Sequence, residues 1–154
     1  MPVRLGVPLR LYWRIHRALM RATGGRFVSV GRLPVLLLTT RGKQSGEPRD
    51  VALSYIRDDD CYVVVGSYAG EDRDPAWWRN LKANPDCRIT VDGKTIRARA
   101  REAEGAHRQL LWARIVERNP DYAEYQSRTK RRIPVVLLEP FAQPLPAKRP
   151  LKPR

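Results

Sequence analysis

The chain has 154 residues, of which 42% are hydrophobic, and it carries a formal net charge of +14. A chain of this length and apolar content can bury one core, so we expect a single domain. The excess of positive charge favours an acidic partner, whether nucleic acid, anionic lipid or a polyanionic small molecule, and does not choose among them.

The chain has two cysteines, Cys61 and Cys87, and both of its histidines are isolated. This pattern indicates neither a disulfide framework nor a zinc site, and it favours a reducing, cytoplasmic setting.

Membrane insertion is not expected from the sequence. No uncharged segment approaches the roughly 18 residues that a membrane-spanning helix needs. The N-terminus also lacks the apolar centre of a secretion signal. We therefore do not expect an integral membrane protein.

The N-terminal segment is basic, with nine Lys or Arg and no Asp or Glu among residues 1–46. Between Leu9 and Ala22 four arginines recur at spacings of four, three and four residues, which places them on one face of a helix. Apolar residues fall largely on the opposite face. Residues 1–26 are therefore predicted to form a basic amphipathic helix. This helix either packs on the domain with its arginines in water or lies on an anionic membrane surface.

A strand, a loop and a second strand are predicted next. Val35–Leu38 is uniformly apolar and is extended by Thr39 and Thr40, as expected of a central strand buried on both faces. A second strand is predicted at Val51–Ile56. The connection between them contains residues typical of turns, namely Gly42, Ser45, Gly46 and Pro48.

The connection also carries charge. Arg41, Lys43 and Arg49 stand near its exposed amides. Amides and cations together bind phosphate or carboxylate through charge-assisted hydrogen bonds, so the loop predicts an anion site. The alternative is a solvated hairpin tip with ordinary surface cations.

The middle of the chain is predicted to contain antiparallel strands with an inserted helix. Asp58–Asp60 form a polar turn that predicts a hairpin between Val51–Ile56 and Tyr62–Ser67. After a loop, a short helix is expected at Pro75–Ala83, with Asp74 as its N-cap and the proline at the first helical position.

A second hairpin is predicted around Asp92-Gly93, between strands at Cys87–Val91 and Lys94–Arg101. In the second of these strands arginines alternate with apolar residues, so its basic face either lines an anion groove or meets solvent. An amphipathic helix follows at residues 105–118 and a last strand at Ile133–Glu139.

The chain ends in residues 141–154, a proline-rich and basic tail that is predicted to be disordered. The elements before it indicate a mainly β, α+β fold. Several closed or nearly closed antiparallel sheets satisfy their order.

Three blocks in this order carry a family resemblance. They are LLLTTRGKQSGEPR at 36–49, GSYAGEDRDPAWWRNLKANP at 66–85 and YAEYQSRTKRRIPVVLLEP at 122–140. The chain resembles the deazaflavin-dependent nitroreductase family, the F420-dependent oxidoreductases of the split β-barrel type, which are related to flavin-binding pyridoxamine oxidases. The resemblance implies a split β-barrel over residues 27–140 with inserted and flanking helices.

The resemblance also implies a cofactor, the deazaflavin F420, whose phosphate and glutamate tail carry several negative charges; FMN is the alternative. By similarity, the phosphate and tail would be held by Lys43, Gln44, Ser45 and Arg49, with Gly42 and Gly46 permitting close backbone contact. The ring would be bordered by Ser67, Tyr68, Ala69 and Gly70. The pocket would be closed by Trp77, Asn80 and Lys82. We expect one of Trp77 and Trp78 to face the pocket and the other to fill the core, although both could be core residues.

The chemistry implied is hydride transfer from reduced F420 to a hydrophobic acceptor such as a quinone or nitroaromatic. The protein would position the acceptor and exclude water. The catalytic candidates are Tyr122, Tyr125 and Ser67. The alternative for the tyrosines is a packed pair with hydroxyls reaching solvent.

The sequence departs from the family pattern in the loops. Tyr68 replaces a frequent lysine, Ala69 replaces a glycine, Asn119 replaces a tyrosine and Gln44 replaces a second basic residue. Several cations remain, so the departures affect substrate preference more than cofactor binding. Reduction of nitroimidazoles is not implied.

Two other classes of function remain as alternatives. One is a non-catalytic protein on the same fold that binds the deazaflavin or a fatty acid. The other is a nucleic-acid-binding module, which ranks last because no RNA-binding or helix-turn-helix pattern accompanies the charge. We expect a small-molecule acceptor, no nucleic acid, peripheral contact with the inner face of the plasma membrane and, by family analogy, a homodimer.

Overall fold

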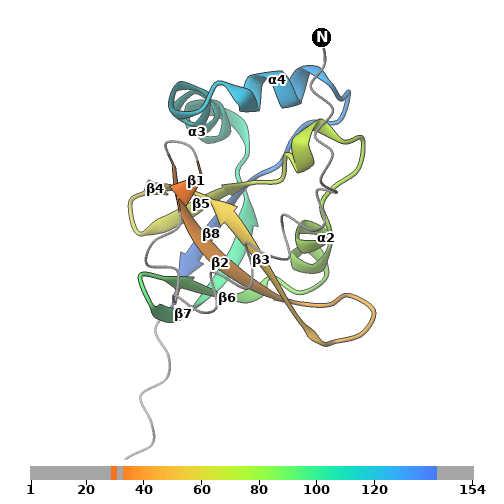
Figure 1. Cartoon of the computed structure of the whole chain (residues 1–154), viewed down its shortest axis with the longest axis vertical. Helices are drawn as coiled ribbons and strands as arrows, with labels where there is room; N and C mark the ends of the chain where they lie inside the picture. The colour runs from red at the N-terminus through yellow and green to blue at the C-terminus, as the bar shows by residue number, and fades with distance from the viewer. Residues whose placement is uncertain (1–28, 31–32, 142–154) are drawn as a thin grey trace, which may run out of the picture.

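A computed structural model describes residues 29–30 and 33–141, which form a curled antiparallel sheet with helices around it (Figure 1). The strands are β1 (Ser29–Val30), β2 (Leu33–Arg41), β3 (Pro48–Ser54), β4 (Ile56–Asp58), β5 (Cys61–Val65), β6 (Asp86–Val91), β7 (Lys94–Glu102) and β8 (Val135–Pro140). The helices are the 3-10 turn η1 (Tyr68–Gly70) and the α-helices α2 (Ala76–Ala83), α3 (Gly105–Arg118) and α4 (Asp121–Ser127). The predicted N-terminal helix (1–26) and, apart from residue 141, the predicted tail lie outside the described residues.

The sheet has the strand order β1-β2-β6-β7-β8-β5-β4, and β3 pairs with β2 off this path. All its pairings are antiparallel. The sheet curls, so that β3 also contacts β5 (Figure 1). This curl forms the half-barrel of a split β-barrel, as the sequence predicted.

The sheet has an apolar core on each face. One face packs against α2 through residues that include Leu36, Leu38, Trp77, Trp78 and Ile89. The other packs against α3 and α4 through residues that include Val63, Val135, Leu137, Leu111 and Ile115. All four residues of Val35–Leu38 are buried, so the predicted central strand is confirmed.

The strand predicted at Val51–Ile56 is interrupted. The Tyr55 amide donates to the Pro34 carbonyl oxygen at 3.0 Å, and at this residue the chain leaves β2 for a new partner. β3 pairs with β2, whereas β4 pairs with β5. The predicted hairpin therefore forms between shorter strands, Ile56–Asp58 and Cys61–Val65.

The inserted helix begins one residue later than predicted. Pro75 occupies the N-cap position of α2 without a side-chain hydrogen bond, so the prediction of Asp74 as the N-cap is wrong. The Asp74 carboxylate instead accepts from Lys82 Nζ at 2.8 Å and from Arg131 Nη1 at 3.3 Å. Tertiary ion pairs have taken the place of a local cap.

The other predicted elements are confirmed with small shifts at their ends. Asp92 and Gly93 have φ of +50° and +77°, the left-handed geometry of a tight hairpin turn. Helix α3 spans the predicted 105–118. Among the described residues, none of the helices has the length and apolarity to cross a membrane.

Candidate functional site

The connection between β2 and β3 forms a closed loop of residues 42–47, called here the hairpin loop. Its ends are joined by the Gly42 amide, which donates to the Glu47 carbonyl oxygen at 2.8 Å. The Gly46 amide donates back to the Gly42 carbonyl oxygen at 2.9 Å, with a φ of +71° at Gly46. Lys43, Gln44, Ser45 and Gly46 are all exposed on this loop.

Three cations lie in or beside the hairpin loop, namely Lys43 within it and Arg41 and Arg49 in the strands that flank it. Within residues 29–30 and 33–141, no carboxylate forms an ion pair with Arg41, Lys43 or Arg49. Arg49 Nη2 donates to Ser45 Oγ at 3.4 Å, and Ser45 Oγ also accepts from the Glu47 amide. Three exposed cations are therefore available to an anionic guest.

A buried asparagine fixes the hairpin loop to α2. The Asn80 side chain is 8% exposed, and its Oδ1 accepts from the Lys43 amide at 3.0 Å. Its Nδ2 donates to Thr40 Oγ1 at 3.1 Å. Asn80 therefore holds the backbone that carries Lys43, a role that sequence reasoning missed, as it missed Thr40. The predicted contact between Asn80 and the cofactor stays a prediction.

The other predicted residues of α2 lie beside this link. Trp77 and Trp78 are 7% and 6% exposed and meet edge to face in the core, with ring centroids 6.3 Å apart. Lys82 is exposed and paired with Asp74. Both tryptophans contribute to the core, and pocket contacts of Trp77 and Lys82 stay predictions.

The predicted ring-bordering residues form a turn with unusual backbone geometry. We call residues 66–74 the η1 loop. Tyr68, Ala69 and Gly70 have φ of +45°, +52° and +81°. The left-handed region costs an L-residue roughly 1–2 kcal/mol, so the surrounding structure must hold Tyr68 and Ala69 there.

Close packing against α4 supports the η1 loop. A Cβ on Gly70 would lie 2.8 Å from the Tyr125 carbonyl oxygen and 3.0 Å from Arg128 Cβ. The η1 loop therefore lies directly against the helix that carries the predicted tyrosines. The loop that contains Ser67 is thus beside the helix that contains Tyr125.

Substituting Gly70 by alanine is expected to destabilise the protein by about 2–4 kcal/mol, because it adds a steric clash to the left-handed backbone cost. Gly46→Ala is the matched control, since Gly46 also has a positive φ but a Cβ there meets nothing within 4 Å. Urea unfolding of the two variants measures the difference. Equal losses would contradict the close approach of the η1 loop to α4.

The two tyrosines lie in different surroundings. Tyr122 is 9% exposed and belongs to the core beneath α3 and α4, and burial raises its pKa to about 12. Tyr125 is half-buried, and burial raises its pKa above the ordinary value. Their rings meet edge to face at 5.8 Å. Both phenols therefore stay protonated near neutral pH and can donate a hydrogen bond.

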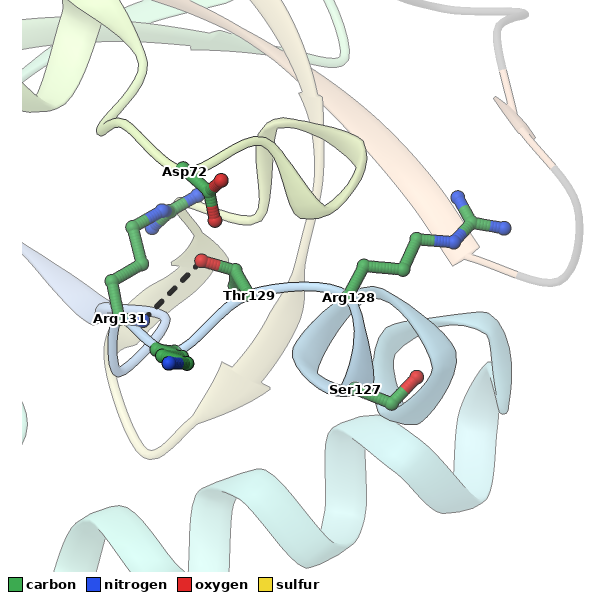
Figure 2. A pocket seen from close by; sticks show the side chains of 6 residues that line it. Asp72, Ser127, Arg128, Thr129 and Arg131 are labelled. Atoms are coloured by element: carbon green, nitrogen blue, oxygen red, sulfur yellow. Dashed lines mark hydrogen bonds between the residues drawn. The ribbon is translucent and has the colours of Figure 1, made fainter.

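An open cavity of about 660 Å³ lies beside the η1 loop, lined by Asp72 and by residues 127–131 (Figure 2). None of these residues was predicted as a site residue. Figure 2 shows the Arg131 side chain extending toward Asp72, whereas the end of the Arg128 side chain points away from Asp72. Arg131 lies in the third block of the family resemblance, residues 122–140. Its place in that block is the sequence signal that could have identified it as a site residue.

The predicted site residues thus form two groups. Figure 1 shows the hairpin loop projecting at one end of the curled sheet, α4 at the opposite end and α2 beside the sheet between them. The η1 loop packs on α4. The structure brings Lys43 together with Asn80, and Gly70 together with Tyr125, in an elongated arrangement.

The fold described above is the split β-barrel that is also found in an F420-H2 dependent reductase of known structure. The model of the F420H(2)-dependent quinone reductase family matches residues 11–140. The chain belongs to that family. It is an enzyme that uses F420H2 as its cofactor and transfers hydride from it to quinones.

Two curated relatives from Mycobacterium tuberculosis are similar to most of this chain. The F420H(2)-dependent quinone reductase Rv1261c is 42% identical over 130 residues, covering 81% of this chain and 87% of its own. A putative F420H(2)-dependent quinone reductase, Rv3178, is 39% identical over 108 residues, covering 70% and 91%.

Solved structures support the same fold. An F420-H2 dependent reductase, FDR-A, has 39% identity and a TM-score of 0.64, covering 73% of this chain and 100% of its own. A chain described as a domain-swapped dimer has 37% identity and a TM-score of 0.65, covering 82% and 94%. HutZ, the heme storage protein from Vibrio cholerae, has 16% identity and a TM-score of 0.54, covering 85% and 92%, and shows the fold alone.

Proposed function

We propose that the hairpin loop and the η1 loop hold F420H2 between them, and that Tyr125 borders the quinone. Lys43 and Arg49 would bind the phosphate and glutamate tail, and Ser67–Gly70 would border the ring. This proposal is carried by one observation: among the described residues, the exposed cations in and beside the hairpin loop have no acidic partner, and Asn80 fixes this loop to α2.

The residues present fit the chemistry of this cofactor. A tail with several carboxylates needs more than one cation, and charge-assisted hydrogen bonds from Lys and Arg are strong contacts for it. Glu47 is the one acid in the hairpin loop, and its side chain is exposed. When bound, F420H2 supplies the hydride, so the protein needs little acid-base apparatus.

Tyr125 is proposed to donate a hydrogen bond to a quinone oxygen as that oxygen gains charge. Its raised pKa keeps the phenol protonated, so it acts as a donor and not as a base. The reaction reduces the quinone by one hydride and one proton and leaves F420 oxidised. Oxidation of F420H2 would release one proton together with the hydride, which balances the proton that the quinone gains, so Tyr125 needs only to donate a hydrogen bond.

The test compares Tyr125→Phe with Tyr122→Phe in F420H2 oxidation by menadione. We expect Tyr125→Phe to slow quinone reduction about 3- to 10-fold, the value of one hydrogen bond, without weakening the binding of oxidised F420. Tyr122→Phe should lower stability instead, because its hydroxyl is buried beside Ser54. If Tyr122→Phe alone slows the reaction, the acceptor lies on the core side of α4.

Fluorescence titration with oxidised F420 tests the cofactor assignment. Saturable binding is expected, and tight FMN binding with no F420 binding would overturn it. A protein that binds F420 but shows no turnover with a panel of quinones and nitroaromatics would be the non-catalytic binder.

Assembly and location are also proposed. A relative described as a domain-swapped dimer supports a homodimer, which light scattering in solution would reveal. The proposed cytoplasmic location with contact to an anionic membrane depends on residues 1–26, which are basic in sequence. Replacing their arginines by glutamine should reduce sedimentation with anionic liposomes, and unchanged sedimentation would exclude the contact.

A further inference from the structure

One guanidinium group, that of Arg131, donates hydrogen bonds to four residues of the η1 loop. Arg131 Nη2 donates to the Ser67 carbonyl oxygen at 2.8 Å and Nη1 to that of Gly66 at 3.1 Å. Its Nε donates to the Glu71 carbonyl oxygen at 2.7 Å. Nη1 also reaches the Asp74 carboxylate at 3.3 Å. With its side chain 15% exposed, Arg131 contacts both ends of the turn that holds Tyr68–Gly70.

The backbone of Arg131 is itself attached to α4. Gln126 Nε2 donates to the Arg131 carbonyl oxygen at 2.8 Å, and Gln126 Oε1 accepts from the Ile133 amide at 3.0 Å. The Arg131 amide donates to Thr129 Oγ1 at 3.3 Å (Figure 2). The guanidinium therefore keeps a fixed position relative to the helix that carries Tyr125.

Arg131 is also connected to α2, through Asp74. Asp74, which accepts from Arg131, also accepts from Lys82 at 2.8 Å. Helix α2, the η1 loop and α4 thus meet at Arg131 and its direct partners. Left-handed residues such as Tyr68 and Ala69 persist only where their surroundings determine them, and they occur often at functional sites.

We propose that Arg131 is a positioning residue that sets the place of the η1 loop, and hence of the ring beside it, relative to the acceptor site at α4. This inference rests on the proposed function. Arg131 acts through the carbonyl groups of Ser67, Gly66 and Glu71, and it need not touch the cofactor or the acceptor. Lysine cannot replace it, because one ammonium group cannot reach acceptors that the planar guanidinium fork spans.

The experiment compares Arg131→Lys with Arg132→Lys. Both variants keep the net charge, and Arg132 is the adjacent, exposed arginine. For Arg131→Lys we expect single-turnover hydride transfer to menadione to fall by about 100-fold, as a misplacement on the order of 1 Å can cause. Binding of oxidised F420 should change by less than about threefold, because the hairpin loop is left intact. Arg132→Lys should match the original protein in both measurements.

Amide hydrogen exchange gives a readout that needs no cofactor. The amides of Gly70 and Glu71 donate to the carbonyl oxygens of Ser67 and Tyr68, so they report on the turn itself. In Arg131→Lys they should exchange at least about tenfold faster, while the Asn84 amide in the α2 C-cap keeps its rate.

The hydride-transfer and hydrogen-exchange measurements together test the positioning role of Arg131. Equal hydride-transfer rates in the two variants, or unchanged exchange at Gly70 and Glu71, would overturn the role of Arg131. Equal losses of binding, rate and Asn84 protection would show a general structural role and would overturn it too. If the original protein failed to reduce quinones with F420H2, the proposed function would fall, and the exchange data would still show whether Arg131 fixes the loop.

Discussion

Removing Lys43 of the hairpin loop together with Arg49 of β3 is expected to weaken F420 binding by at least about 100-fold. Each charge-assisted hydrogen bond contributes roughly 1.5–3 kcal/mol, and the exposure of Lys43 and Arg49 places them at the lower end of that range. The variant Lys43→Ala/Arg49→Ala removes both hydrogen bonds and should therefore weaken binding by about 3 kcal/mol. The measurement is the dissociation constant of oxidised F420 from fluorescence titration.

Salt should separate this effect from a change in structure. At physiological ionic strength charges are screened over about 8 Å, so raising the salt concentration should weaken binding to the original protein. The double variant should respond less, because it no longer has the two cations that hold the tail. Hydride transfer at saturating F420H2 should be little changed, since the η1 loop and Tyr125 are untouched.

A matched control tests whether overall charge is responsible. Lys94→Ala/Arg97→Ala also removes one lysine and one arginine, from exposed positions of β7. Its F420 affinity should stay within about threefold of the original protein, since long-range charge effects are screened. An equal loss in the control variant would show that the hairpin loop is not the binding site.

Local patterns in the sequence were sufficient for most of the fold. The apolar run Val35–Leu38 needs burial on both faces wherever it lies, and the sheet with cores on both sides provides it. Asp92-Gly93 favours a tight turn through its own backbone preferences. Local patterns of this kind do not predict the order of strands in the sheet, because pairings such as β2 with β6 join segments that are distant in sequence.

Long-range side-chain contacts explain the errors and omissions at the site. Asp74 has the chemistry of an N-cap, but Arg131, 57 positions away, and Lys82 take its carboxylate. Asn80 lies 37 positions from Lys43, so only the folded chain shows that it fixes the hairpin loop. The spacing of Tyr122 and Tyr125 predicted a shared helical face. It could not show that one would be nearly enclosed by the core and the other half-buried.

The second large effect is expected at Asn80, whose two amide atoms satisfy two separate partners. Asn80→Leu would leave the buried Thr40 hydroxyl without its partner, which costs about 1–3 kcal/mol, and would remove the hydrogen bond to the amide of the exposed Lys43, which contributes about 0.5–1.5 kcal/mol. We expect a loss of about 2–4 kcal/mol and a fall in melting temperature of about 5–15 °C. F420 affinity should fall as well, because the backbone of the hairpin loop loses its attachment to α2.

Two further variants separate the loss of stability from the loss of F420 affinity. Asn80→Leu with Thr40→Val replaces both members of the buried pair by apolar groups, which can be nearly neutral, so it should recover part of the stability. It should not recover F420 affinity, because the Lys43 amide remains unpaired. Asn84→Ala, which removes a weaker contact of the Asn84 side chain with the Asp86 amide at 3.2 Å, should leave F420 affinity unchanged. If Asn80→Leu weakened F420 binding without lowering the melting temperature, Asn80 would contact the cofactor directly and would not act through the loop.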